Sequence, residues 1–446
     1  MAEETPNWGI EPVPDRFRVL GLLDTTLLWG NLGVSLLVLV LGALLVPALS
    51  LPQAVVAVLA GGLIGNAMLG AAALIGSDGR VPAMVLLRAP LGRRGSYGAT
   101  AVNAAQCIGW SIFELIIIAT AAAALSDSLL GFEARWAWTL VFGGVALAMA
   151  LLGPVGVVRK ILRRYAIWIV LASLAYLTWW ALDGADVSAI WSAPGEGGLS
   201  TWIGIDLVVA LTVSWLPLVA DYTRFSRDRR SALVGTGLGY FVAASWMFLL
   251  GAVLVLGRGL DDPSALPAAV AAAGLASALA LLAVTVDETD EAFANIYSAG
   301  VSLQNVAPQL PQRALLAGVS VVATIGALLI DLGAYQSFLL LLGSVFVPLF
   351  GVLLADWLLA GRHYSERDIF AAPTLRPGLV VAWLAGFAAY QWLHPLGPGW
   401  WVDLVEGTSP PAWEIGSTLP GFAVAFGLAA AASWVERRIR AASVTA

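Results

Sequence analysis

Residues 283–298 read AVTVDETDEAFANIYS, so four acidic side chains interrupt an otherwise apolar segment. In a helix, with about 100° between successive residues, one face carries Asp287, Asp290, Glu291, Asn295 and Ser298. A carboxylate inside a bilayer is costly unless it is paired, hydrated, protonated or bound to a cation. We therefore expect a positively charged group to bind at this face.

The composition indicates an integral membrane protein. Of the 446 residues, 59% are hydrophobic and 12% are charged, whereas soluble domains carry about 25% charged residues. Apolar runs long enough to cross roughly 30 Å of hydrocarbon recur along the chain, which favours helices over barrel strands. The single cysteine, Cys107, excludes a disulfide framework. The polar first nineteen residues lack the apolar core of a signal peptide. We expect the lipid bilayer as a partner, and no nucleic acid.

Twelve apolar segments predict twelve transmembrane helices. They span roughly residues 20–48, 54–75, 99–125, 136–157, 165–182, 201–222, 233–257, 267–302, 314–332, 335–360, 378–394 and 419–435. The predicted organisation is a cytoplasmic segment (1–19), a ten-helix core (20–360, with halves of about 20–182 and 201–360), two peripheral helices (361–435) and a cytoplasmic tail (436–446).

The basic residues predict the orientation of these helices. With a cytoplasmic N-terminus, all but two of the 23 Lys and Arg residues fall on the cytoplasmic side, and the exceptions are Arg135 and Arg258. The loop after the fourth span contributes Arg159, Lys160, Arg163 and Arg164 to that side. We therefore expect a plasma-membrane protein, in the inner membrane of a bacterial cell, with both termini in the cytoplasm.

Two predicted spans contain residues that break helices. The first carries Gly30 and Gly33 around Asn31, and the sixth carries Pro217. Glycine weakens a helix and proline removes a donor, and membranes tolerate the freed backbone groups only where they line a cavity. A simple kink explains either break alone. Because the two spans begin the two five-helix halves, we interpret the pair as the midplane site of a transporter with an inverted repeat.

The third span carries a second polar face, formed by Asn103, Gln106, Trp110 and Glu114. Hydrogen bonding between helices explains Asn103 as well as a binding role does. An amide beside an indole, as in Gln106 and Trp110, suits a planar heterocycle with donor and acceptor edges. Trp215 in the sixth span supplies a second indole, so we expect a flat ring to bind between the two.

Several short motifs occur in a fixed order along these spans. They are WGIEPVP (8–14), GGLIGN (61–66) followed by IG (75–76) and VP (81–82), LGRRGSY (91–97), NAAQCIGW (103–110), SW (214–215) followed by DYTRF (221–225), and YSAG (297–300). In this order the sequence resembles the nucleobase–cation symporter family, which includes cytosine permeases, hydantoin transporters and hydroxymethylpyrimidine transporters. The resemblance covers nearly the whole chain.

The resemblance implies an all-helical LeuT-type fold. Ten core helices form two inverted five-helix repeats with broken helices one and six, two further helices follow, and the protein works by alternating access. It also implies that the substrate ring lies between Trp110 and Trp215, beside Gln106 and Ser214. The full set of residues that we expect at the substrate is Asn31, Gln106, Trp110, Glu114, Ser214, Trp215 and Asn295.

The eighth span departs from the family pattern. Relatives imply a sodium site made by carbonyls at the first break and two threonines of span eight, but this chain has Asp290 and Glu291 near the threonine positions. A carboxylate suits Na+, and a buried carboxylate also carries a proton in many transporters. We expect cation coupling at Asn31, Val34, Asp287, Asp290 and Glu291, with any bound Na+ at Asn31, Val34, Asp290 and Glu291, and no other cofactor. Glu288, at the edge of the acidic face, is interpreted as a bystander.

These features predict a secondary active importer for a cytosine-like or hydroxymethylpyrimidine-like base, coupled to Na+ or H+. An enzyme is not expected, because no intramembrane histidine and no nucleophile–base pair accompany the acidic residues. The alternative is an amino-acid or amine symporter on the same scaffold, which would need free amides at the first break more than two indoles. The sequence leaves the base, the cation and the oligomeric state open.

Overall fold

The computed structural model describes residues 9–157, 167–259, 266–330, 335–411, 413 and 415–445. Trp8 of the first motif and Arg159, Lys160, Arg163 and Arg164 of the basic loop lie outside these residues. The described part is helical throughout, apart from loops and one isolated bridge between Leu20 and Ser226.

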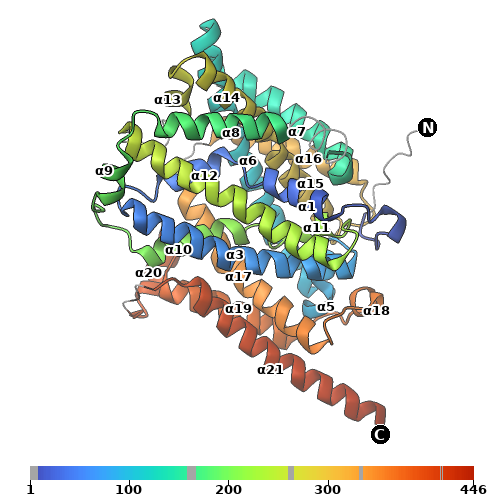
Figure 1. Ribbon diagram of the computed structural model, residues 1–446. Helices are drawn as coiled ribbons and strands as arrows, with labels where there is room; N and C mark the ends of the chain where they lie inside the picture. Colours follow the sequence, from blue (N-terminus) through green and yellow to red (C-terminus); the bar gives the residue numbers. More distant parts are fainter. Residues whose placement is uncertain are drawn as a thin grey trace, which may run out of the picture.

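The longer helices follow the twelve expected spans (Figure 1). In chain order they are α1 (Leu22–Asn31) with α2 (Leu36–Ala43), α3 (Leu51–Gly79), α6 (Gly95–Leu130), α7 (Arg135–Val157), α8 (Ile167–Leu182), α10 (Thr201–Val213) with α11 (Val219–Thr223), α12 (Thr236–Arg258), α14 (Leu275–Asp287) with α15 (Thr289–Leu303), α16 (Gln312–Leu329), α17 (Tyr335–Leu359), α19 (Pro377–Leu393) and α21 (Thr418–Thr445). The short connecting elements are η1 (Asp15–Phe17), α4 (Ala83–Leu86), α5 (Arg88–Leu91), α9 (Val187–Ser192), η3 (Ser231–Gly235), α13 (Leu266–Ala272), α18 (Glu366–Phe370) and α20 (Gly399–Glu406).

Several of these helices are able to cross a membrane. Within the described residues, seven are long and apolar enough to do so, and the bent pair α1 and α2 makes an eighth. The other expected spans coincide with shorter helices, α8 and α19, or with helices divided by a break, α10 with α11 and α14 with α15. The chain is therefore a multi-pass membrane protein, and its helix order is consistent with twelve spans.

The predicted break in the first span is confirmed. Helices α1 and α2 are bent by 58° across the residues between them. Gly33 sits in this break, and a Cβ there would lie 3.0 Å from the backbone nitrogen of Ala244 in α12, so only glycine allows so close an approach. After the break, the Ser35 hydroxyl caps α2 by accepting a hydrogen bond from the amide of Leu37 (3.1 Å).

The predicted break in the sixth span is also confirmed. Helix α10 ends at Val213, and α11 begins only at Val219, with turns between them. Pro217 lies in this interval and has no amide hydrogen to continue a helical ladder. The Trp215 carbonyl accepts hydrogen bonds from the amides of both Leu218 (3.1 Å) and Val219 (2.9 Å), and so satisfies part of the interrupted backbone.

The expected eighth span, 267–302, is too long at its start. Helix α13 ends at Ala272, and Gly274 has a φ of 124°, a conformation that favours glycine and separates α13 from α14. The continuous segment is therefore α14 followed by α15, which meet at Glu288. The acidic residues lie at this junction, in the middle of the segment.

Glycines allow α2 and α12 to pack with their backbones in contact. A Cβ at Gly251 of α12 would overlap the carbonyl oxygen of Leu39 in α2, and a Cβ at Gly42 would overlap the carbonyl oxygen of Phe248. Small residues at such crossings are how membrane helices approach closely without a hydrophobic driving force between them. This contact fixes α2, and with it one side of the break in the first span.

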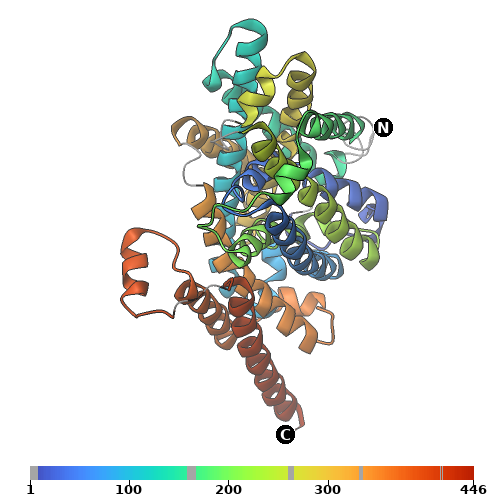
Figure 2. The ribbon, with the colours of Figure 1, turned by 60° about the vertical axis from the view of Figure 1, so that its left-hand side comes forward.

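The two C-terminal spans lie along one side of the bundle. Helices α19 and α21 pack against α17, and the end of α21 extends beyond the other helices (Figures 1 and 2). A buried pair joins these helices, because Arg376 donates two hydrogen bonds of 2.9 Å to the carboxylate of Asp356. Arg376 also donates to Glu436 (2.8 Å). The contacts of Asp356 are therefore those of a structural ion pair.

The α2–α12 crossing generates a stability prediction. Gly251→Ala places a methyl group against the Leu39 carbonyl, and we expect it to lower the free energy of unfolding by about 1–3 kcal/mol, as overpacking does elsewhere. Gly144→Ala in α7 is the matched control, since a Cβ there meets no atom within 4 Å. Thermal unfolding in detergent checks both variants. Equal melting temperatures for the two would contradict the described packing.

Candidate substrate and cation site

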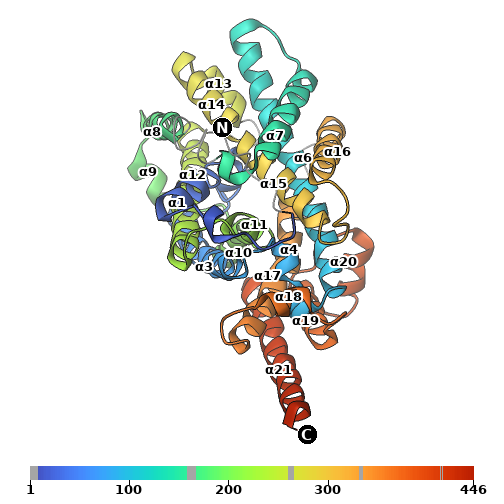
Figure 3. The same cartoon turned by 90° about the vertical axis from the view of Figure 1, so that its right-hand side faces the viewer.

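The candidate site lies where the broken helices meet α6 and α15, in the central part of the molecule in the view of Figure 3. The four acidic residues of the α14–α15 junction are all buried, with exposed fractions of 8% for Asp287, 0% for Glu288, and 5% for both Asp290 and Glu291. Buried carboxylates require hydrogen-bond donors or cations. Their partners divide them into two groups.

Asn31, at the end of α1, holds the first group. Its side-chain amide donates hydrogen bonds to Asp287 Oδ1 (3.0 Å) and to Asp290 Oδ2 (2.7 Å). One amide therefore ties the break of the first span to two carboxyl groups of the eighth. Because both acceptors are carboxyl oxygens beside one another, a proton or a cation at this group would reduce their mutual repulsion.

Glu288, interpreted from the sequence as a bystander at the edge of the acidic face, contacts the break from its other side. Its carboxylate accepts hydrogen bonds from the Ser35 hydroxyl (2.7 Å) and from the Leu36 amide (2.6 Å). These donors form the N-terminus of α2, where unpaired amides and the helix dipole favour a negative charge. Glu288 therefore caps the second half of the broken span and is fully buried.

The second acidic group connects the eighth span to the third. One carboxyl oxygen from each of Glu114, Glu288 and Glu291 lies within 4.8 Å of the others. Glu114 belongs to α6 and has no exposed surface. In the described part of the chain, these three carboxyl groups are the only cluster of His, Cys, Asp or Glu side chains that lie close enough together to hold a metal ion. Its oxygens are suited to a proton or to a cationic group.

A small pocket opens directly onto this cluster. Two indoles, Trp110 and Trp215, and the phenol of Tyr240 contribute its aromatic walls. The remaining lining residues are Ser35, Leu37, Val38, Glu114, Leu211, Ser214, Leu218, Glu291 and Asn295. Such a combination of flat apolar faces and a few polar groups is typical of a site for a small planar molecule.

The aromatic walls are held by specific contacts. The indole nitrogen of Trp215 donates to the Tyr240 hydroxyl (3.0 Å), and Trp29 of α1 packs edge-on against Trp215 with ring centroids 5.6 Å apart. Trp110 packs edge-on against Phe338 of α17, also at 5.6 Å. Elements α1, α12 and α17 thus position the two indoles, which leaves their orientation sensitive to movement of those helices.

Five of the seven residues predicted at the substrate line this pocket, namely Trp110, Glu114, Ser214, Trp215 and Asn295. Gln106 and Asn31 do not. The Gln106 amide donates to the Ser214 carbonyl (3.1 Å) and to Asn103 Oδ1 (2.9 Å), so in this conformation it holds the break of the sixth span. Asn31 contacts the carboxylates behind the pocket, as described above.

The residues predicted to bind the cation also have two different sets of neighbours. Asp290 is bonded to Asn31, whereas Glu291 lies within 4.8 Å of Glu114 and Glu288. The Val34 amide donates to the Asn31 carbonyl (2.9 Å), which forms a turn in the break. Ser35 and Tyr240 were missed. Ser35 lies beside the glycines of the first break, and this position could have indicated a role at the site. Nothing comparable in the sequence indicates Tyr240.

The N-terminal segment closes the end of the bundle that carries most arginines. The Leu20 amide donates to the carbonyl of Phe225, just after α11 (3.1 Å). Arg224, fully buried, donates to the Gly9 carbonyl (3.0 Å) and to the Tyr297 hydroxyl of α15 (2.9 Å). These bonds tie the N-terminal segment to the sixth and eighth spans below the pocket.

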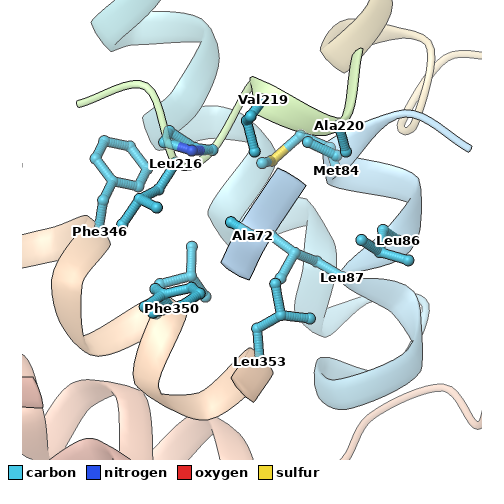
Figure 4. A pocket seen from close by; sticks show the side chains of 13 residues that line it. Ala72, Met84, Leu86, Leu87, Leu216, Val219, Ala220, Phe346, Phe350 and Leu353 are labelled. Atoms are coloured by element: carbon cyan, nitrogen blue, oxygen red, sulfur yellow. The ribbon is translucent and has the colours of Figure 1, made fainter. Parts of the chain in front are cut away.

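A second cavity lies on the far side of the sixth-span break (Figure 4). Leu216 and Val219 face into it from the break, Met84 from α4, and Phe346 and Phe350 from α17. All of its lining side chains are apolar, so it offers no side-chain donor or acceptor to the edge of a base. Of these two pockets, only the one beside Glu114 has polar side chains in its lining.

Comparison with known proteins assigns the family. Residues 12–374 match the model of a family described as permeases for cytosine/purines, uracil, thiamine and allantoin. The chain belongs to this family. Cytosine permease of Escherichia coli K12 is 24% identical over 346 residues, which cover 75% of this chain and 78% of that protein. Hydantoin permease of Microbacterium maritypicum is 24% identical over 392 residues, or 80% and 77% of the two chains.

A solved structure supports the same assignment for the fold. Mhp1, a nucleobase-cation-symport-1 family transporter in a closed conformation with bromovinylhydantoin bound, superposes with a TM-score of 0.78. The match covers 97% of this chain and 96% of that chain at 20% identity. The LeuT-type fold expected from the sequence is confirmed. The family and the fold make the chain a nucleobase-type transporter and not an enzyme.

The cap formed by Glu288 generates a prediction for stability. Glu288→Ala leaves the Ser35 hydroxyl and the Leu36 amide without their acceptor, and we expect a loss of about 1–3 kcal/mol. Glu288→Gln keeps an oxygen acceptor and should lose less. Thermal unfolding of the two variants beside the unchanged protein measures the difference. If Glu288→Ala unfolds at the same temperature as the unchanged protein, the carboxylate does not stabilise the break.

Proposed function

We propose that this transporter imports a planar pyrimidine-like base together with a cation by alternating access. The observation that supports this proposal most is the continuity of the site. The pocket with two indoles opens onto Glu114 and Glu291, and the same segment of the eighth span bonds both sides of the break in the first span. A base and a cation would therefore act on the same mobile elements.

The base would bind between the indoles of Trp110 and Trp215. Burying both faces of a flat ring against aromatic side chains is favourable, and offset or edge-on contacts add to it. Its polar edge would meet Ser214, Asn295 and the carboxyl of Glu114, which line the same pocket. The pocket is narrow in this conformation, so the indoles must separate as a base enters.

The cation would act at the carboxyl groups of the eighth span. Both acidic groups contact the break of the first span, one through Asn31 and the other through Ser35 and Leu36. Neutralising either group by Na+ or H+ changes the attraction between these spans. Cation binding would thereby favour one arrangement of the broken helix over the other, which is the requirement for coupled transport.

Release would require the N-terminal closure to open. From the distribution of basic residues, we place this end of the bundle and both termini in the cytoplasm, and the protein in the plasma membrane. The bonds of Arg224 to Gly9 and Tyr297 join three segments at that end. Breaking them would open a route from the pocket to the cytoplasm.

Uptake of labelled bases tests the proposal. In a host without its own permeases, cytosine, hydroxymethylpyrimidine, uracil, hypoxanthine and allantoin are supplied in turn, and we expect at least one to accumulate. Trp110→Ala should reduce that uptake at least tenfold, since it removes one face of the site. Gln106→Ala should also reduce uptake, because it removes the hydrogen bond to the Ser214 carbonyl at the break of the sixth span.

Trp168→Ala is the matched control for these variants. Trp168 lies on α8 with 69% of its surface exposed, so its loss should leave uptake unchanged. Correct membrane insertion of every variant is checked by its expression level and thermal unfolding. Absence of uptake of all five bases by an inserted protein, or full uptake by Trp110→Ala, would contradict the proposed function.

A further inference from the structure

The residues that line the pocket bear on the charge of the substrate, and this inference rests on the proposed function. We propose that the preferred substrate is a planar nitrogen heterocycle that carries a positive charge, and that Glu114 and Glu291 bind this charge between the indoles. The class includes aminopyridinium and protonated aminopyrimidine rings. Neutral bases that present only carbonyl and imide groups would bind less tightly.

The first observation is the charge of the lining. Two of the twelve residues around the pocket are acidic, Glu114 and Glu291, and none is Lys, Arg or His. A third carboxyl, from Glu288, stands within 4.8 Å of both. The buried guanidinium of Arg224 is bound to Gly9, Tyr297 and the Asp221 carbonyl. The pocket therefore presents acidic groups to its occupant without a basic side chain in its own lining.

The second observation is that these carboxyl groups differ in their hydrogen-bond partners. Glu288 accepts hydrogen bonds from Ser35 and Leu36, so the protein itself satisfies it. Glu114 is hydrogen-bonded to the carboxyl groups of Glu288 and Glu291, and among the described residues neither of its oxygens accepts a hydrogen bond from an amide, hydroxyl or guanidinium group. The same holds for Glu291 Oε1. All three atoms are buried, and their residues line the pocket between the indoles.

These two observations point to a cationic occupant. A buried carboxyl group that lacks donors is costly, and a bound cation with N–H groups satisfies both its charge and its hydrogen bonds. The indole faces of Trp110 and Trp215 add to this preference, because the negative face of an aromatic ring attracts a cation. A neutral ring would gain the stacking but would leave the carboxyl groups unmatched.

Of the two acidic groups, the one bonded to Asn31 lies outside the pocket, and we assign the coupling cation to it when a cationic substrate occupies the other. Asp287 and Asp290 are bonded to Asn31, and none of these three residues lines the pocket. The substrate charge and the coupling cation would therefore bind at neighbouring but different carboxyl groups. A change at Glu114 should alter which substrate is preferred, whereas a change at Asp290 should alter the dependence on the coupling cation.

A matched pair of probes tests the inference. 1-Methyl-4-aminopyridinium and 4-methylaniline share their shape and their amino group, but only the first carries a permanent charge. Binding to the purified full chain is measured by calorimetry and thermal shift, with cytosine and uracil as neutral bases. We expect the pyridinium to bind at least tenfold more tightly than 4-methylaniline at neutral pH, where the aniline is uncharged.

Variants of the carboxyl groups complete the experiment. Glu114→Gln and Glu291→Gln should each reduce the preference for the cation over 4-methylaniline at least tenfold, and the thermal unfolding of each variant without ligand shows that it is folded. Glu133→Gln, on an exposed loop, is the control and should keep the preference. Equal affinity for the two probes, or a preference unchanged in both pocket variants, overturns the inference. If neutral bases bind and the pyridinium does not, only this inference fails; if no probe and no base binds, the proposed function fails as well.

Discussion

Buried carboxyl groups need partners, and in this protein a broken helix supplies them. The junction of α14 and α15 places four acidic side chains inside the bundle, where none is more than 8% exposed. The break of the first span provides the Asn31 amide, the Ser35 hydroxyl and the Leu36 amide that bind three of them. The dependence is mutual, because the same acids satisfy the backbone and side-chain donors that the break exposes. Each feature therefore stabilises the other.

The substrate pocket depends on this arrangement. Trp29, from the last turns of α1, packs against Trp215 at the sixth-span break, and the Gln106 amide holds the Ser214 carbonyl beside it. Movement of α1 relative to α15 would therefore reach both the carboxyl groups and one indole of the pocket. The contacts form a continuous set from the carboxyl groups of the eighth span to the aromatic pocket, so in the proposed mechanism binding at one would affect binding at the other.

The sequence predicts the fold well because its signals are local. Apolar length, the distribution of basic residues, and glycine or proline at 33 and 217 indicate the spans and their breaks without knowledge of tertiary contacts. The site is less predictable. Helical spacing puts Glu288 at the edge of the acidic face, but its role comes from the N-terminus of α2, a contact between distant segments. The neighbouring Trp110 predicts that Gln106 contacts the substrate base. In the structure the Gln106 amide donates to the Ser214 carbonyl, which the sixth-span break leaves free. Tyr240 enters the pocket only through helix packing.

The central claim is that the acidic face of the eighth span couples base and cation through the break of the first span. Reciprocal binding tests it most directly: the affinity for a transported base is measured at low and high concentrations of Na+ and at two pH values, and the cation affinity is then measured with and without that base. Thermodynamic linkage requires the same factor in both directions. We expect each ligand to change the affinity for the other by a factor of at least about 5, at the lower end of typical coupling. Asp290→Asn should reduce this factor while base binding remains. A factor of one for both Na+ and H+, or an unchanged factor in Asp290→Asn, would contradict it.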